Sequence, residues 1–127
     1  MPHVVITGAS RGIGRELVCQ YVDAGWRVTA GVRRPDAAAL PPSARILALD
    51  VEEPASVAAF ANAIDESVDV LLNNAGLFGP RPQTTADADP ALWGRIFQVN
   101  CVAPVLVARA LLDKVAAGDR RVLATVT

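Results

Sequence analysis

The chain has 127 residues, of which 52% are hydrophobic and 20% are charged, and its formal net charge is −1. We expect one globular domain, residues 1–127, because this length and apolar content suffice for a single core and exclude a disordered chain. The small net charge, with a pI of about 5.7, argues against nucleic-acid and membrane-surface binders, which usually carry a clustered basic face.

Strand-like and helix-like segments alternate along the chain. Apolar runs predict strands at residues 4–6, 27–32, 45–49, 68–72 and 122–126, and helical spacing predicts helices at 12–24, 54–64 and 90–117. Residues 35–42 form a Pro- and Ala-rich connection. Strands that are almost continuously apolar and separated by helices indicate a parallel sheet covered on both faces. With right-handed crossovers, this predicts an α/β, doubly wound sheet with strand order 3-2-1-4-5.

Targeting and metal-binding signals are not found in the sequence. No charged leader with an apolar core precedes the first predicted strand, and no uninterrupted apolar stretch reaches membrane-spanning length, so we expect a cytoplasmic protein with no membrane partner. Cys19 and Cys101 lack the paired spacing of a zinc or redox site, so we predict buried thiols and no metal. His3, the only histidine, begins the first predicted strand, where we expect a surface or packing role.

A glycine-rich stretch, Thr-Gly-Ala-Ser-Arg-Gly-Ile-Gly, occupies residues 7–14 between the first predicted strand and the first predicted helix. Glycines there allow a tight turn and a close approach to a ligand, and the helix N-terminus offers amides and a positive dipole end to a pyrophosphate. The alternative is an ordinary strand-to-helix turn. In this context we predict a dinucleotide site that includes Gly8, Ser10, Arg11, Gly12, Ile13 and Gly14.

The spacing Thr-Gly-x-x-x-Gly-x-Gly resembles the cofactor loop of the short-chain dehydrogenase/reductase family. Four further elements follow in the order that this family shows: Asp50-Val51 after the third predicted strand, Asn-Asn-Ala-Gly at 73–76 after the fourth, Asn100 in the long helix, and the fifth strand. Segments 32–35, 71–80 and 99–104 are similar to carbonyl reductases of the C-factor and sniffer type. The resemblance implies a Rossmann-like oxidoreductase that transfers hydride between a nicotinamide cofactor and a carbonyl or alcohol substrate.

Two arginines, Arg33 and Arg34, follow the second predicted strand, at the place where an NAD-binding protein usually has an acidic residue for the ribose 2′-hydroxyl. A guanidinium presents a planar fork suited to a phosphate, and Arg11 of the glycine-rich loop could approach the same 2′-phosphate from its other side. The alternative is a solvated loop tip. We therefore predict NADP as the cofactor, in preference to NAD.

The resemblance also implies roles for residues that follow the third and fourth strands. The carboxylate of Asp50 would accept from the adenine amine and the amide of Val51 would pair with the ring, although Asp50 is also placed to cap the next helix. Asn74, Ala75 and Gly76 would leave room for a ribose and a nicotinamide against the backbone. Taken alone, these residues indicate only an Asx turn at the end of a strand.

Asn100 is the residue of this chain to which we assign a catalytic role. Pro104 lies four residues later and lacks the N–H that would bond the carbonyl of Asn100, so we predict a freed carbonyl and a bend in the long helix. In the family, the matching Asn holds a water that connects to the catalytic Lys. The alternative is a plain proline kink with a solvated Asn.

The family's reaction also uses a Tyr, a Lys four positions later and a Ser. The chain has one tyrosine, Tyr21, and one lysine, Lys114, so it contains no Tyr-x-x-x-Lys, and the sheet is incomplete relative to the family. Three hypotheses follow: a truncated NADP-dependent carbonyl reductase, a non-catalytic NADP-binding or signalling module, or one piece of a split enzyme. Because the fifth strand would be an unpaired apolar edge, we expect a homo-oligomer or a complementing chain.

Overall fold

The computed structural model describes residues 1–79 and 83–127, so the end of the 71–80 segment lies outside the described residues. Five strands form one sheet: β1 (His3–Thr7), β2 (Arg27–Val32), β3 (Arg45–Ala48), β4 (Val70–Asn73) and β5 (Val122–Thr125). The order β3-β2-β1-β4-β5 confirms the predicted topology. All neighbouring strands are parallel, so their carboxyl ends lie along the same edge of the sheet.

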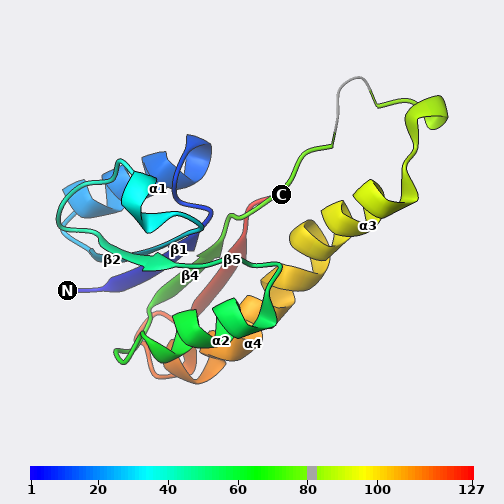
Figure 1. Cartoon of the computed structure of the whole chain (residues 1–127). Coiled ribbons are helices and arrows are strands. Elements are labelled where there is room, and N and C mark those ends of the chain that lie inside the picture. Colours follow the sequence, from blue (N-terminus) through cyan, green and yellow to red (C-terminus); the bar gives the residue numbers. More distant parts are fainter. Residues whose placement is uncertain (80–82) are drawn as a thin grey trace.

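Helices cover both faces of the sheet (Figure 1). α1 (Gly12–Asp23) packs on one face, and α2 (Pro54–Asn62) and α4 (Ala103–Ala116) pack on the other. Neighbouring side chains of β1 point to opposite faces: Val4 belongs to the core beneath α1, and Val5 belongs to the core beneath α2 and α4. Short 3₁₀ turns, η1 (Pro35–Ala37) and η2 (Thr85–Asp87), lie in the connections.

The long helix predicted at 90–117 runs from Pro90 to Ala116 and contains a π-helical turn. α3 (Pro90–Phe97) leads into η3 (Gln98–Val102) and then into α4. The amide of Ala103 donates to the carbonyl of Gln98, five residues earlier. Pro104 has no N–H for the carbonyl of Asn100, which interrupts the α-helical ladder here. A π turn therefore lies at the place where the bend was predicted from Pro104.

This long helix is also apolar enough to cross a membrane by length and composition alone. It has 27 residues and a best-window mean hydropathy of 1.5. Charged residues interrupt it, among them Arg95 and Arg109, so it is not the uninterrupted apolar stretch whose absence was expected. Core helices of soluble proteins share this composition. Here Val107, Leu111 and Val115 are buried against the sheet, and 22% of the apolar window is buried.

Apolar side chains are exposed on the outer side of the long helix and on β5. Phe97, Val105 and Leu112 are 60%, 65% and 51% exposed, and Leu123 of the edge strand is 47% exposed. An apolar edge was expected for the fifth strand. The prediction of buried thiols is wrong for Cys101, which is exposed and borders a cleft, and Cys19 is only half-buried.

A buried histidine lies at the amino end of the sheet. The His3 ring contacts the carbonyl oxygen of Ser67 through Nδ1 at 2.9 Å and the hydroxyl of Thr29 through Nε2 at 2.8 Å. His3 and Thr29 are 2% and 1% exposed. Burial lowers the pKa of His3, because the charged ring would lose its hydration. Of the surface and packing roles that were expected for His3, the structure therefore shows the packing role.

A buried carboxylate organises the same end of the sheet. Asp69 accepts from the backbone amides of His3 at 2.8 Å, Asp119 at 3.0 Å and Arg120 at 3.2 Å. These hydrogen bonds, above all the one from His3, lower the pKa of Asp69 because they favour the charged carboxylate. One side chain thus connects β1, the start of β4 and the turn between α4 and β5.

Candidate functional site

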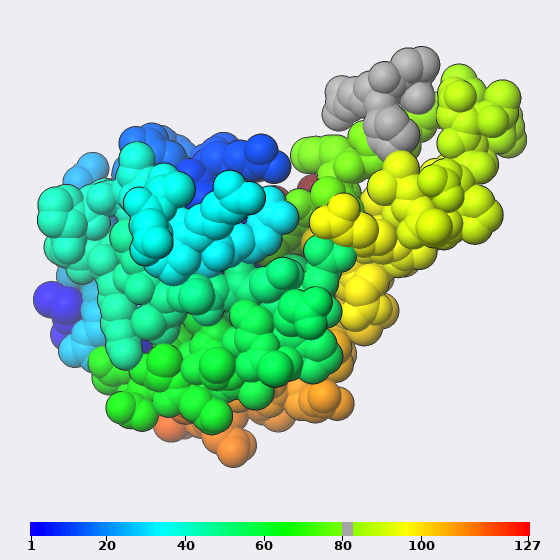
Figure 2. All heavy atoms as spheres, viewed as in Figure 1, coloured from blue at the N-terminus to red at the C-terminus, as the bar shows by residue number. Residues whose placement is uncertain are grey.

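A cleft of about 840 Å³ lies at the carboxyl ends of the strands. The loops after β1 and β4 both border it, and ligands of open parallel sheets bind at this point, where the strand order reverses. Figure 2 shows the α3 segment standing out from the rest of the molecule. The predicted site residues that line the cleft are Gly8, Ser10, Arg11, Gly12, Ile13, Arg33, Asp50, Val51, Asn74, Ala75, Gly76 and Asn100.

The loop after β1 depends on its glycines for both conformation and space. Gly8 and Gly12 have positive φ angles of 62° and 58°, in the left-handed region that favours glycine. Gly14 is buried and does not line the cleft. A Cβ atom at Gly14 would overlap the carbonyl oxygen of Gly8 and the side-chain nitrogen of Asn74. The first turn of α1 therefore packs directly against the backbone of Gly8 and the side chain of Asn74.

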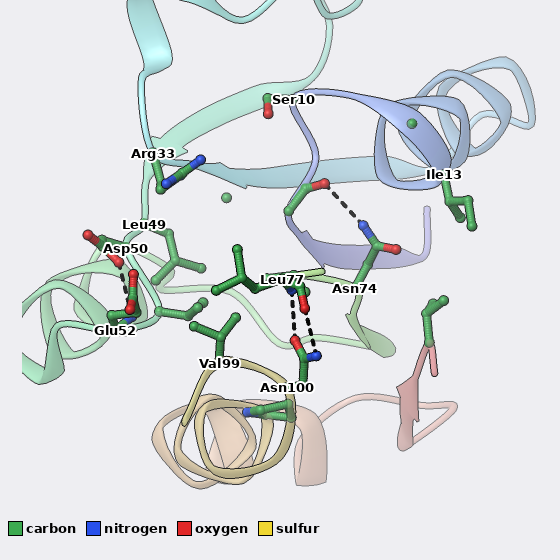
Figure 3. Close-up of a pocket in the computed structure, with 18 of the residues that line it drawn as sticks. Ser10, Ile13, Arg33, Leu49, Asp50, Glu52, Asn74, Leu77, Val99 and Asn100 are labelled. Atoms are coloured by element: carbon green, nitrogen blue, oxygen red, sulfur yellow. Dashed lines mark hydrogen bonds between the residues drawn. The ribbon is translucent and has the colours of Figure 1, made fainter. Parts of the chain in front are cut away.

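Thr7, the last residue of β1, holds the two loops of the cleft together. Its hydroxyl accepts from the backbone amides of Asn74 and Ala75, each at 3.0 Å. Asn74 in turn donates from Nδ2 to the carbonyl of Gly8 at 3.0 Å (Figure 3). Thr7 is only 1% exposed, so water cannot easily replace these hydrogen bonds. The spacing of the two loops is thus set by side chains from both.

Two asparagines attach the end of β4 and the following loop to the long helix. Asn100 accepts from the amide of Leu77 at 2.7 Å through Oδ1 and donates to its carbonyl at 2.9 Å through Nδ2 (Figure 3). Asn73, the last residue of β4, donates to the carbonyl of Pro104 at 3.2 Å. The Asn100 side chain is therefore engaged with backbone, while its own carbonyl lies opposite the proline that cannot donate to it.

Asp50 organises the turn between β3 and α2 at the edge of the cleft. Its Oδ1 accepts from the amide of Glu52 at 3.0 Å, and its own amide donates to the hydroxyl of Ser56 at 2.8 Å. The N-cap residue of α2 is Glu53, so the alternative that Asp50 caps this helix is wrong. Within the described residues, no hydrogen bond reaches the second carboxylate oxygen of Asp50, which leaves it available to a ligand.

Charged side chains gather on the side of the cleft formed by β2 and β3. Arg11 and Arg33 are exposed and line the cleft, whereas Arg34 is exposed but lies outside it. Glu52 is paired with Arg95 of α3 through two hydrogen bonds, Nε to Oε1 at 2.8 Å and Nη2 to Oε2 at 3.1 Å. The hydrogen bond from Arg95 holds the pKa of Glu52 below its ordinary value.

The sequence patterns did not identify several residues that complete the cleft. Residues 125–127 could have been predicted, because they lie at the carboxyl end of a predicted strand. The contact of Arg95 with Glu52 could not, because it depends on tertiary packing and leaves no pattern in the local sequence. In residues 1–79 and 83–127 no group of His, Cys, Asp and Glu could hold a metal ion. The unpredicted lining residues are Gly31, Val32, Leu49, Glu52, Leu77, Phe78, Arg95, Val99, Cys101, Pro104, Thr125, Val126 and Thr127.

Sequence comparison matches almost the whole chain to one family. The family model described as short chain dehydrogenase matches residues 2–126. The chain is 35% identical over 139 residues to the short chain dehydrogenase tazN of Aspergillus terreus, with 97% of this chain and 30% of that protein covered. The chain spans from 30% to 49% of the length of the curated relatives that it matches.

Solved structures of similar fold include two reductases. A carbonyl reductase from Pseudomonas aeruginosa PAO1 in complex with NADP superimposes with a TM-score of 0.85 at 28% identity, covering 98% of this chain and 60% of that one. A 3-ketoacyl-(acyl-carrier-protein) reductase from Brucella melitensis complexed with NADH has a TM-score of 0.79 at 29% identity, covering 89% and 50%. These likenesses confirm the Rossmann-like fold predicted from the strand and helix pattern.

Proposed function

Because this chain belongs to the short chain dehydrogenase family, we propose that it binds NADP and forms the cofactor-binding part of an oxidoreductase that acts on a carbonyl or alcohol substrate. One observation carries the proposal. The loop after β1, the turn after β3 and the loop after β4 are far apart in the sequence, yet all three line a single cleft at the carboxyl ends of the strands.

The residues of the cleft fit a dinucleotide. Gly8 and Gly12 have no side chains and border the cleft beside the N-terminus of α1, which suits a pyrophosphate, and Ser10 and Ile13 border the same space. The free carboxylate oxygen of Asp50 and the amide of Val51 suit an adenine ring. Ala75 and Gly76 leave backbone on the other side for a ribose and a nicotinamide, the group that would supply hydride.

The preference for NADP over NAD is supported by the arginines. Arg33 follows directly after β2 and lines the cleft together with Arg11, so two guanidinium groups are available to a 2′-phosphate. We assign a lesser role to Arg34, which lies outside the cleft. One of the similar structures is a complex with NADP and another a complex with NADH, so the preference is inferred from the side chains of this chain alone.

The catalytic acid must come from residues outside these 127. Tyr21 packs edge-on against Trp26, with 4.8 Å between ring centroids, and Lys114 donates to the carbonyl of Ala61. Neither residue lines the cleft. We propose that a longer chain or a partner chain supplies the Tyr and Lys, and that the carbonyl of Asn100 accepts a hydrogen bond from a water on the proton path. This observation also supports the second candidate, an NADP-binding module without turnover.

Calorimetric titration of the chain with NADPH and with NADH tests the cofactor assignment. We expect NADPH to bind more tightly than NADH. The variant Arg33→Glu should reverse or abolish that preference, because a carboxylate repels the 2′-phosphate and accepts from a ribose hydroxyl. Absence of binding by either cofactor contradicts the proposal, and an unchanged preference in the variant contradicts the role of Arg33.

Turnover and assembly provide two further tests. We expect no oxidation of NADPH when the chain alone is incubated with NADPH and a panel of carbonyl compounds. Measured turnover would contradict the proposal that the catalytic Tyr and Lys come from outside these 127 residues. We also propose a cytoplasmic location and association through apolar surface such as the β5 edge, where Leu123 is 47% exposed. Sedimentation that shows a compact monomer at micromolar concentration would argue against that association.

A further inference from the structure

The ion pair between Glu52 and Arg95 lies in the wall of the cleft, although neither residue belongs to the predicted cofactor contacts. The two hydrogen bonds, at 2.8 and 3.1 Å, make the pair bidentate. The side chains are 26% and 49% exposed, and such exposed pairs contribute little to protein stability. A stabilising role therefore does not account for the placement of this pair at the cleft.

Further charges surround this pair on the same side of the cleft. Asp50 accepts from the backbone amide of Glu52, so both carboxylates belong to the turn that follows β3. Figure 3 shows Arg33, Asp50 and Glu52 together on this side. Arg33 lies close enough to Glu52 to contribute to the lowering of its pKa, after the larger contribution from Arg95. Arg95 thus binds Glu52 directly, and Arg33 is a further cation on the same side of the cleft.

The identity of the guanidinium that binds Glu52 determines the charge that a ligand meets. While Arg95 holds Glu52 through two hydrogen bonds, Arg33 is exposed, lines the cleft and makes no hydrogen bond to the described residues. Without Arg95, the negative charge of the Glu52 carboxylate would no longer be neutralised, and it would attract the guanidinium of Arg33. A 2′-phosphate carries close to two negative charges at neutral pH and a 2′-hydroxyl carries none, so this change would weaken the binding of NADPH selectively.

We propose that Arg95 is a specificity-determining residue that acts through Glu52: by pairing with this carboxylate, it leaves Arg33 free for the 2′-phosphate of NADP. The inference rests on the proposed function, because it concerns the same cleft. Arg95 need not touch the cofactor, and it is a positioning residue in this sense. The charge-neutral pair is therefore part of the machinery that distinguishes NADP from NAD.

The test is a double-mutant cycle in which the ratio of NADPH to NADH affinity is measured by calorimetry on the full chain. Arg95→Met should lower this ratio about three- to tenfold, the size expected for one unit charge acting through screened solvent. Arg95→Lys should preserve most of the ratio because it keeps the charge. Glu52→Gln combined with Arg95→Met should restore the ratio, because the unpaired carboxylate is then absent.

Arg109→Met is the matched control. It removes an equal charge from an exposed residue of α4 that does not line the cleft, and it should leave the ratio unchanged. An Arg95→Met variant that keeps the wild-type ratio, or that loses affinity for both cofactors equally, would overturn the inference while the cofactor assignment stands. A wild-type chain that binds neither cofactor overturns the proposed function and this inference together. Thermal unfolding of each variant checks that the fold is retained.

Discussion

The two ends of the parallel sheet use polar side chains in opposite ways. At the amino end, His3, Thr29 and Asp69 are buried, and their polar atoms are bonded to other parts of the chain. At the carboxyl end, one carboxylate oxygen of Asp50 accepts no hydrogen bond from the described residues, and Arg33 is exposed and lines the cleft. The comparison shows that polar residues at one end close the fold, whereas those at the other end leave hydrogen-bonding capacity for a ligand.

This difference gives a way to separate residues of the fold from residues of the site. Substitutions at the carboxyl end should change cofactor binding, and substitutions at the amino end should change stability alone. Thr7 is the informative intermediate, because it is as buried as the amino-end residues but holds the loops of the cleft.

Gly14→Ala should abolish measurable NADPH binding and lower the free energy of unfolding by about 1–3 kcal/mol, the usual cost of overpacking. The added Cβ would overlap the carbonyl oxygen of Gly8 and the side chain of Asn74, so the loop must move. Calorimetry and denaturant unfolding measure the two effects. Gly94→Ala is the control: it adds the same methyl group to α3 where nothing lies within 4 Å, and it should be neutral or stabilising.

Thr7→Val should weaken NADPH binding several-fold and lower the free energy of unfolding by about 1–3 kcal/mol. Valine keeps the shape of the side chain but leaves the amides of Asn74 and Ala75 without their acceptor. The same titration and unfolding experiments apply. Thr7→Ser keeps the hydroxyl and should retain most of the affinity; equal losses in both variants would show that the methyl group matters and the hydrogen bonds do not.

Asp69→Asn should lower the melting temperature and leave the NADPH affinity of the folded chain unchanged. The amide offers one acceptor oxygen to three backbone amides and places an NH₂ group against the others. Differential scanning fluorimetry measures the loss, and calorimetry below the transition measures the affinity. A marked loss of affinity would break the distinction between the two ends of the sheet.

The pH dependence of stability should report His3 and have no counterpart in cofactor affinity. Because burial lowers the pKa of His3, the unfolded chain takes up the proton first. The free energy of unfolding should therefore fall as the pH drops below the ordinary value of 6.5 and level off below the folded pKa. Urea unfolding between about pH 5 and pH 8 measures this slope.

His3→Gln should flatten this slope, because the ionising ring is then absent. The pKa of Asp69 is also shifted, downward from 3.8, so its contribution is lost only at more acidic pH and does not overlap this window. A slope that persists in the variant would assign the effect to another group and would contradict the burial argument for His3.

The sheet was predictable because its strands are short, apolar and separated by helices. The glycine-rich loop fixed the position of β1 and, with it, the strand order. The boundary of β4 was less accurate: it begins at Val70 and not at Val68, since the amide of Val68 donates to the carbonyl of Lys114. Such hydrogen bonds between distant segments leave no periodic pattern in the sequence.

The candidate site was predictable where a backbone conformation requires a residue type. Gly8 and Gly12 are examples, because their positive φ angles favour glycine. Contacts between side chains were not predictable: Glu52 and Arg95 are 43 positions apart, and only the tertiary fold brings them together. The exposure of Cys101 was missed for the same reason, since helical spacing alone does not show which side of a helix borders a cleft.

The π turn at Gln98–Val102 has a geometric consequence for the rim of the cleft. A π turn accommodates one residue more than an α-helical turn, and one residue corresponds to about 100° of rotation about the helix axis. α3 and α4 are therefore out of phase, and the number of residues in this segment sets which side of α3 faces Glu52. Deletion of a single residue here would rotate Arg95 away from Glu52 but would remove none of the residues proposed to contact the cofactor.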